Sequence, residues 1–121
     1  MNLMRFASAP EYFPRHHDGM RCLRLQGHEA GESDTVWIGL SQIEPGGGTS
    51  FDASTVEKLY VVLEGAVTIV TDTGEVELRP FDSCRLAPGE RRQLANRTRQ
   101  PAMILLVMPY SPPRESTGAP T

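Results

Sequence analysis

Short runs of β-branched and aromatic residues, each followed by glycine, proline or aspartate, recur along most of this 121-residue chain. Such runs occupy residues 20–25, 35–43, 58–63, 67–70, 76–78, 83–86, 92–95 and 102–108. Strands spaced about 8 to 12 residues apart with turn residues between them are typical of β-sandwiches and barrels. The sequence therefore predicts an all-β fold in which no helix is needed.

The length allows one domain with a single hydrophobic core. We expect an N-terminal arm over residues 1–19, a barrel over residues 20–110 and a flexible C-terminal tail over residues 111–121. The tail is predicted from its prolines and polar residues, which cannot bury enough apolar surface to fold.

Two prolines, Pro10 and Pro14, exclude a regular helix through the arm. We expect an extended segment that packs through Phe6, Tyr12 and Phe13 on the barrel or on a second subunit. Beyond the arm, residues 20–25 and 35–43 should pair as a hairpin, with the second strand stopped at Pro45 and the glycines after it.

The charge balance limits the partners that this chain can have. Acidic residues outnumber basic ones by 15 to 12, and nucleic-acid-binding domains normally carry a dominant basic face. The longest apolar run, residues 102–108, falls far short of the ~20 residues of a membrane span. Residues 1–10 show no export signal, and Cys22 and Cys84 are expected as reduced thiols. We therefore expect a cytoplasmic protein that binds a small molecule, with no nucleic-acid or membrane partner.

Glycines and turn residues recur at a spacing that resembles the two motifs of a small cupin. The first motif runs from Gly46 to Gly65, and the second contains Gly89 and closes on Asn96. The resemblance covers about residues 35–108. It implies a double-stranded β-helix, also called a jelly-roll barrel. The expected type is the conserved barrel of small, single-domain, RmlC-like cupins.

The resemblance places four side chains where cupins hold a metal ion: Asp52, Ser54, Lys58 and Arg92. First-row divalent metals need neutral imidazole, carboxylate or thiolate donors, whereas an ammonium and a guanidinium repel a cation. We therefore predict no metal and no cofactor at this position.

The orientation of the strand at residues 58–63 can be interpreted in two ways. A plain alternation would place Leu59, Val61 and Leu63 in the core and leave Lys58 and Tyr60 outside. The resemblance implies the reverse, with Lys58 inside the barrel mouth and the apolar face covered by another strand or a second subunit. We follow the resemblance, and we expect a homodimer.

Lys58 is the only lysine in the chain, against eleven arginines. An ammonium in a poorly solvated pocket can lose its proton and act as a base or nucleophile, which a guanidinium cannot do. A compositional bias toward arginine explains the lone lysine equally well. A salt bridge from Lys58 to Asp52 that replaces the metal also remains possible, as does an Arg92 that points to solvent beside Arg91.

The candidate site residues follow from this frame. The candidate catalytic residues are Lys58, Tyr60 and Asp52, and the candidate substrate-binding residues are Arg92, Ser54, Trp37 and Gln42. The planar guanidinium of Arg92 can donate two parallel hydrogen bonds to a carboxylate. The alternative role for Trp37 is packing in the core or in a dimer interface. The alternative role for Tyr60 is packing of its ring, with the hydroxyl as a polar end.

The sequence is compatible with three functional hypotheses. The first is a metal-independent lyase or isomerase that acts on a small carboxylate-bearing molecule with Lys58 as base. The second is a non-catalytic cupin that binds a small molecule or stabilises a partner. The third is a metal-dependent enzyme with unusual ligands from His16, His17 or His28, although adjacent histidines in a solvated loop and a histidine in a turn are the simpler interpretation.

Overall fold

The computed structural model of the protein describes residues 1–110, and the predicted tail, residues 111–121, lies outside them. The predicted all-β fold is confirmed, with two single-turn 3₁₀ helices that the sequence did not predict. The elements are η1 (Phe6–Ser8), β1 (Glu11–Tyr12), β2 (His17–Gln26), η2 (His28–Ala30), β3 (Val36–Thr49), β4 (Lys58–Glu64), β5 (Val67–Thr71), β6 (Gly74–Leu78), β7 (Ser83–Leu86), β8 (Arg92–Ala95) and β9 (Ala102–Pro109). None of the helices in residues 1–110 is long and apolar enough to cross a membrane.

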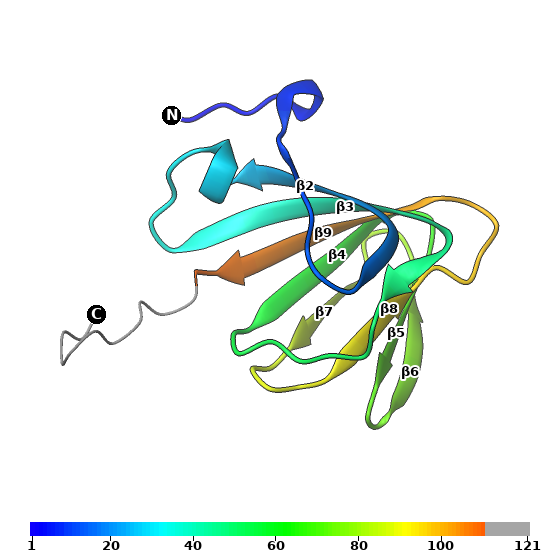
Figure 1. Cartoon of the computed structure of the whole chain (residues 1–121). Helices are drawn as coiled ribbons and strands as arrows, with labels where there is room; N and C mark the ends of the chain where they lie inside the picture. The colour runs from blue at the N-terminus through cyan, green and yellow to red at the C-terminus, as the bar shows by residue number, and fades with distance from the viewer. Residues whose placement is uncertain (111–121) are drawn as a thin grey trace, which may run out of the picture.

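The strands form a nine-stranded antiparallel sheet that wraps into a jelly-roll barrel. Its order is β6-β5-β8-β3-β9-β4-β7, with β2 on the second edge of β3 and β1 on β2. Figure 1 shows β2, β3, β9 and β4 side by side in one layer, with β8, β5 and β6 in a second layer that crosses it. The predicted hairpin of β2 and β3 is present, and its register aligns Leu23 with Leu40.

Strand β3 links the two layers because it continues through the glycines where the sequence predicted that it would stop. It passes Pro45 and ends at Thr49. Gly46 adopts a φ of 82°, which a residue with a side chain rarely takes. A Cβ at Gly48 would lie 2.1 Å from the carbonyl oxygen of Leu94 on β8. The glycines therefore bend the strand and let it approach β8 rather than end it.

The inner face of β4 carries Lys58, Tyr60 and Val62, as the resemblance implied and the plain alternation did not. Tyr60 and Val62 are 3% and 0% exposed, whereas Leu59 and Leu63 on the opposite face are 39% and 37% exposed. The core is built from inward residues of both layers: Ile43, Tyr60, Val62, Val67, Ile69, Leu78, Leu86, Leu94, Ala102 and Ile104. Toward Lys58 on β4 and Trp37 on β3, the inner face becomes hollow and partly polar.

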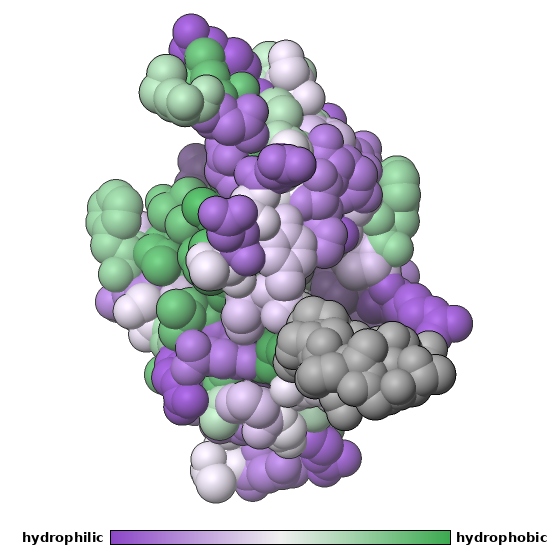
Figure 2. All heavy atoms as spheres, turned by 90° about the vertical axis from the view of Figure 1, so that its left-hand side faces the viewer, coloured by the Kyte–Doolittle hydropathy of each residue, from purple (hydrophilic) through white to green (hydrophobic). Residues whose placement is uncertain are grey.

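The outer face of the first layer is apolar across four strands. Leu23, Leu40, Leu105 and Val61 stand in register on β2, β3, β9 and β4. On the side of the molecule seen in Figure 2, hydrophobic residues form several clusters separated by hydrophilic side chains. Within this chain, residues 1–110 leave Leu59 at the end of the outer face partly exposed.

The predicted arm joins the barrel earlier than the sequence indicated. Strand β2 begins at His17 rather than at Met20, and Tyr12 pairs with Cys22 across β1 and β2. Of the three aromatic residues expected to pack, Tyr12 lies against Trp37 of the barrel at a centroid distance of 5.9 Å, whereas Phe6 and Phe13 are 55% and 83% exposed. Their packing on a second subunit stays a prediction.

Asn96, which closes the second motif, joins the end of β8 to neighbouring segments through hydrogen bonds of its buried side chain. Its side chain is 1% exposed, its amide donates to the carbonyls of Ile43 at 2.9 Å and Gln100 at 2.7 Å, and its Oδ1 accepts from Thr98. We expect Asn96→Ala to lower the free energy of unfolding by about 2–3 kcal/mol, because it leaves buried backbone groups without partners. Urea denaturation monitored by the fluorescence of Trp37 measures this loss.

The matched control is Arg97→Ala, which removes an exposed ion pair with Glu75. That change should cost no more than about 0.5 kcal/mol. Equal losses in Asn96→Ala and Arg97→Ala would contradict the anchoring role of Asn96.

Candidate functional site

Two cavities lie at the hollow end of the barrel and share Lys58 and His17. The smaller has a volume of about 170 Å³ and also includes Asp52 and Arg92 in its wall. The larger has a volume of about 460 Å³ and extends to Trp37 and beyond. Lys58 and His17 therefore lie on the shared wall of two adjacent cavities, which strands β2, β3, β4, β8 and β9 line together.

Lys58 is partly buried at the start of β4, where it pairs with Leu86 of β7. Burial, followed by the positive charge of Arg92, lowers the pKa of Lys58 to about 8, against an opposing effect of Asp52. None of the ion pairs formed within residues 1–110 includes Lys58. The predicted alternative of a Lys58–Asp52 salt bridge is therefore wrong, and the amine faces the cavities.

Arg92 is held rigidly at the floor of the smaller cavity. It is 6% exposed, its Nε donates to the hydroxyl of Tyr60 at 3.2 Å, and its Nη1 lies 3.4 Å from the carbonyl oxygen of Asp52. The backbones of Arg92 and Asp52 also exchange two hydrogen bonds. The alternative in which Arg92 points to solvent is wrong, because its neighbour Arg91 is the exposed one and pairs with Asp72.

Tyr60 lies on β4 two residues after Lys58 and lines neither cavity. Burial raises the pKa of its phenol, so the hydroxyl stays protonated at neutral pH. Its contact with Arg92 makes it a positioning residue for the guanidinium. Asp52 lies at the exposed rim, where its Oδ2 accepts from the hydroxyl of Ser50 at 2.8 Å.

The structure brings Trp37 to the site but leaves Ser54 and Gln42 outside it. Trp37 is buried and lines the larger cavity. The hydroxyl of Ser54 accepts from the backbone N–H of Val56 at 3.2 Å and shapes the loop before β4. Gln42 lines a separate cavity beside Glu64. The family spacing located the loop of Ser54 but did not show which way its side chain turns.

His17 is a site residue that the sequence interpretation assigned to a solvated loop. It is the first residue of β2, it pairs with Thr49 of β3, and it lines both cavities. Its Nδ1 lies 2.6 Å from the carbonyl oxygen of Arg15, which assigns the proton to Nδ1 and leaves Nε2 as a proton acceptor. Burial lowers the pKa of His17, as do the charges of Arg92 and Lys58, so the imidazole is neutral at pH 7.

Arg24 and Tyr12 are further residues that the sequence interpretation did not place in the site. The Arg24 guanidinium carbon lies 3.6 Å from the ring centre of Tyr12 and 4.3 Å from that of Trp37. Its Nε donates to Glu29 at 2.9 Å. Gly39 makes room for this stack, because a Cβ there would lie 2.9 Å from the Trp37 ring. The alternation of β2 carries a signal for Arg24, which shares a face with buried Cys22.

The residues present do not fit the metal ion that the family frame implies. Two of the four ligand positions carry Lys58 and Arg92, and both side chains face the smaller cavity. Within residues 1–110, no three histidine, cysteine, aspartate or glutamate side chains gather closely enough to hold a metal. His28 packs against the ring of Trp37 at a centroid distance of 5.3 Å.

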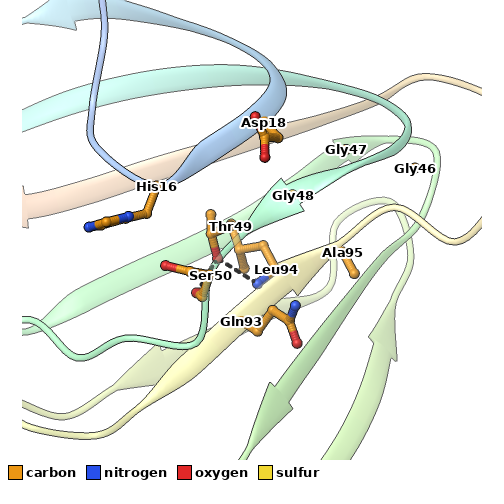
Figure 3. A pocket seen from close by; sticks show the side chains of 10 residues that line it. All are labelled: His16, Asp18, Gly46, Gly47, Gly48, Thr49, Ser50, Gln93, Leu94 and Ala95. Atoms are coloured by element: carbon orange, nitrogen blue, oxygen red, sulfur yellow. Dashed lines mark hydrogen bonds between the residues drawn. The ribbon is translucent and has the colours of Figure 1, made fainter.

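A third cavity, of about 330 Å³, adjoins the smaller one through His16, Thr49 and Ser50. Figure 3 shows His16 and Asp18 on one side of it and the glycines of β3 on the other. The hydroxyl of Thr49 accepts from the backbone N–H of Leu94 at 3.0 Å and ties β3 to β8. The charged or titratable side chains that line this third cavity are His16 and Asp18, whereas the cationic pair of Lys58 and Arg92 lines the smaller cavity.

These groups can bind an anion and move a proton beside it. Arg92 supplies a fixed guanidinium, Lys58 an amine whose pKa is about 8, and His17 an imidazole with a free Nε2. Groups whose pKa values lie near the working pH are the most effective proton acceptors and donors. The arrangement suits abstraction of a proton from carbon next to a carboxylate or carbonyl group.

Comparison with known proteins agrees with the fold. The model of the family described as Cupin domain (Cupin_2) matches residues 39–108. A protein named beta-D-galactosidase Rv1717, from Mycobacterium tuberculosis, is 40% identical over 111 residues, which cover 91% of this chain and 95% of that protein.

Two solved structures show the same barrel. The polyketide cyclase RemF of Streptomyces resistomycificus has a TM-score of 0.83 at 21% identity, over 94% of this chain and 82% of its own, a likeness that shows the fold alone. A sugar phosphate isomerase of the cupin superfamily from Silicibacter pomeroyi has a TM-score of 0.75 at 27% identity, over 90% of this chain and 76% of its own. Together with the family match, the barrel and the spacing of its two motifs identify this chain as a member of the cupin family.

Proposed function

We propose that this protein is a metal-independent enzyme that binds a small carboxylate-bearing molecule and moves a proton on it, as an isomerase or lyase. One observation carries the proposal. The amine of Lys58, with its pKa lowered to about 8, lines the same cavity as the buried guanidinium of Arg92 and the neutral imidazole of His17. An amine placed so is partly unprotonated at neutral pH and can act as a base.

In the proposed reaction, Arg92 binds the substrate carboxylate and Lys58 accepts a proton from the neighbouring carbon. The electron pair of the broken C–H bond moves toward a carbonyl oxygen and forms an enolate. The positive charges of Arg92 and of the newly protonated Lys58 stabilise this enolate. Return of the proton to an adjacent carbon gives isomerisation, and departure of a group from that carbon gives elimination.

Exchange of substrate hydrogen with solvent tests proton abstraction without knowledge of the final product. Tag-free, chelator-treated protein is incubated in D₂O with pyruvate, 2-oxoglutarate, D-gluconate or D-galacturonate, and loss of the C–H proton is followed by NMR. We expect exchange on at least one of these compounds that depends on Lys58. Binding without exchange would favour a non-catalytic cupin instead.

A second candidate activity is hydrolysis of a β-galactoside, which the 40% identical beta-D-galactosidase favours. Many glycosidases use two carboxyl groups, and the two cavities hold Asp52 and Glu29. Hydrolysis of 4-nitrophenyl β-D-galactoside that is lost in Asp52→Asn and Glu29→Gln, but retained in Lys58→Met, would select this activity over proton transfer.

We also propose that a second copy of the chain covers the part of the outer face that lies on β9 and β4, because Leu23 and Leu40 on β2 and β3 are already buried within one chain. The in-register apolar row ends at β4, where Leu59 and Leu63 remain partly exposed. A two-fold dimer places the same patch on both partners, so one apolar face can bury its own copy.

We further propose a cytoplasmic location, which the free thiols of Cys22 and Cys84 support.

We expect the wild-type protein to scatter light as a dimer, with twice the 13.3 kDa mass of the chain. Leu59→Glu should convert it to a monomer, because it buries two like charges in the interface. The control is Val76→Glu, which changes an exposed residue of β6 outside this face and should leave the dimer intact. A wild-type protein that is itself monomeric would contradict the proposed dimer.

A further inference from the structure

The larger cavity provides room for more of the substrate than its anionic group. The smaller cavity, at about 170 Å³, holds the guanidinium of Arg92, whereas the larger one offers about 460 Å³. The latter lies within the size range of small-molecule sites. Its apolar wall comes from Trp37, Leu106 and Met108, and its polar wall from Arg24 and Glu29.

Arg24 is preorganised to bind a ligand. Its guanidinium is stacked on Tyr12 and Trp37, and Nε donates to Glu29 at 2.9 Å. Its Nη1 and Nη2 have no acceptor within residues 1–110. In the same residues no buried side-chain nitrogen lacks a partner, so the Nη groups reach solvent in the cavity. They can donate hydrogen bonds to a ligand without losing a protein contact.

Glu29 neutralises Arg24 and supplies the opposite hydrogen-bonding capacity. A hydrogen bond from its own backbone N–H, together with the one from Arg24, lowers the pKa of Glu29, so the group is a carboxylate that only accepts. The pair thus offers N–H donors and oxygen acceptors side by side with no net charge. A second anionic group would meet the Glu29 carboxylate, and a purely apolar chain would displace water from the Nη groups of Arg24 without replacing its hydrogen bonds.

Hydroxyl groups match this wall because each one both donates and accepts. The C–H faces of a polyol chain or sugar ring match the apolar side chains that line the same cavity, among them Leu106 and Met108. The two cavities therefore differ in the chemistry that they recognise: the smaller carries the guanidinium of Arg92, the larger carries the neutral pair of Arg24 and Glu29, and the amine of Lys58 lines both.

We propose that the site recognises a polyhydroxylated anion, a sugar acid or sugar phosphate, whose anionic group binds Arg92 and Lys58 and whose hydroxyls bind Arg24 and Glu29. This inference rests on the proposed function only for the position of the anionic group. Arg24 and Glu29 then determine specificity, while proton transfer stays with Lys58.

Calorimetric titration with matched six-carbon probes tests this substrate class. D-Gluconate and D-galactonate carry both a carboxylate and hydroxyls, hexanoate carries only the carboxylate, and galactitol carries only hydroxyls. At least one of the sugar acids should bind about a hundredfold more tightly than hexanoate and galactitol, because a site built for hydroxyls discriminates against analogues that lack them. Galactose 6-phosphate shows whether a phosphate serves better than a carboxylate.

Two variants assign the preference to the polar pair. Arg24→Met and the more conservative Glu29→Gln should each remove most of the preference for the sugar acid and leave the affinity for hexanoate unchanged. Circular dichroism and thermal melting of both variants establish that the barrel is intact. Arg92→Met should weaken both acids together.

The outcomes separate the two proposals. If hexanoate binds as tightly as both sugar acids, or if neither sugar acid binds, the substrate class is wrong. If Arg24→Met and Glu29→Gln weaken hexanoate and the sugar acid equally, the pair has no specificity role. If instead a sugar acid binds and responds to Arg24 but not to Arg92 or Lys58, the inference about the hydroxyl wall holds and the proposed function fails.

Discussion

Replacing Lys58 by methionine should lower kcat by about 10²- to 10⁴-fold, the usual contribution of a positioned acid or base. The unprotonated amine is the proposed proton acceptor, and its pKa of about 8 sets its availability. The rate in the wild-type protein should therefore rise with pH and level off above about 8. Initial rates of solvent exchange, measured by NMR across this range, give the profile.

The control is Lys58→Arg, which keeps the positive charge but cannot lose its proton near neutral pH. It should be as inactive as Lys58→Met. An arginine variant with near-normal activity would show that position 58 supplies charge rather than a base. A methionine variant with normal activity would contradict the proposed role altogether.

The same Lys58→Met substitution should stabilise the folded protein at neutral pH. The pKa of Lys58 falls from 10.5 to about 8 on folding, so the folded state binds fewer protons between these two values. The stability of the wild-type protein therefore rises with pH across this window, and below it the folded protein carries the full cost of a poorly solvated ammonium.

Methionine removes that cost. We expect a gain in the free energy of unfolding of about 1–2 kcal/mol at pH 7, after allowance for the partial exposure of the amine. The gain should shrink as pH rises and vanish near 10.5, the ordinary pKa of the group. Urea denaturation of both proteins at several pH values measures it, and a gain that does not change with pH would point to packing instead.

Replacing Arg92 by methionine should weaken binding of a carboxylate ligand by roughly 30- to 1000-fold, the effect of about 2–4 kcal/mol. Arg92 is held by Tyr60 and by the backbone of Asp52, so it binds an anion at little further ordering cost. Its charge also lowers the pKa of Lys58. The variant should therefore move the midpoint of the pH profile upward.

Arg91→Met is the matched control, because it removes the adjacent arginine that faces outward and pairs with Asp72. Affinity and pH profile should match those of the wild-type protein. If both variants weakened binding to the same extent, the effect would come from the net charge of the protein and not from a direct contact between Arg92 and the carboxylate. If Arg92→Met left affinity unchanged, the anion would bind elsewhere.

Much of the fold could be predicted from the sequence because turn residues and strand spacing are local features. The spacing from Gly46 to Gly65 placed Lys58 on the correct face of β4, where plain alternation failed. Alternation failed because the outer face is also apolar, and only the position of neighbouring strands separates an apolar outer face from a core. The sequence also predicted that β3 would stop at Pro45, whereas the strand continues to Thr49. That continuation depends on contact with β8, which is distant in the sequence and leaves no local pattern.

The site was less predictable because its side chains come from strands far apart in the chain. His17 reaches the mouth through its register with Thr49, which no local pattern shows. Arg24 becomes a site residue only when β1 and β3 bring the rings of Tyr12 and Trp37 to its guanidinium. Ser54 shows the opposite error, because its position in the motif is right while its hydroxyl is used by the loop.

The most direct test of the account is the pKa of Lys58 itself. Lys58 is the only lysine in the chain, so protein labelled with ¹³Cε-lysine gives a single side-chain signal whose chemical shift follows the protonation of that amine. A titration midpoint of about 8 is expected, rising in Arg92→Met and unchanged in Arg91→Met. A midpoint near 10.5, the same in all three proteins, would mean that the amine is solvated and would contradict the proposed acid–base site.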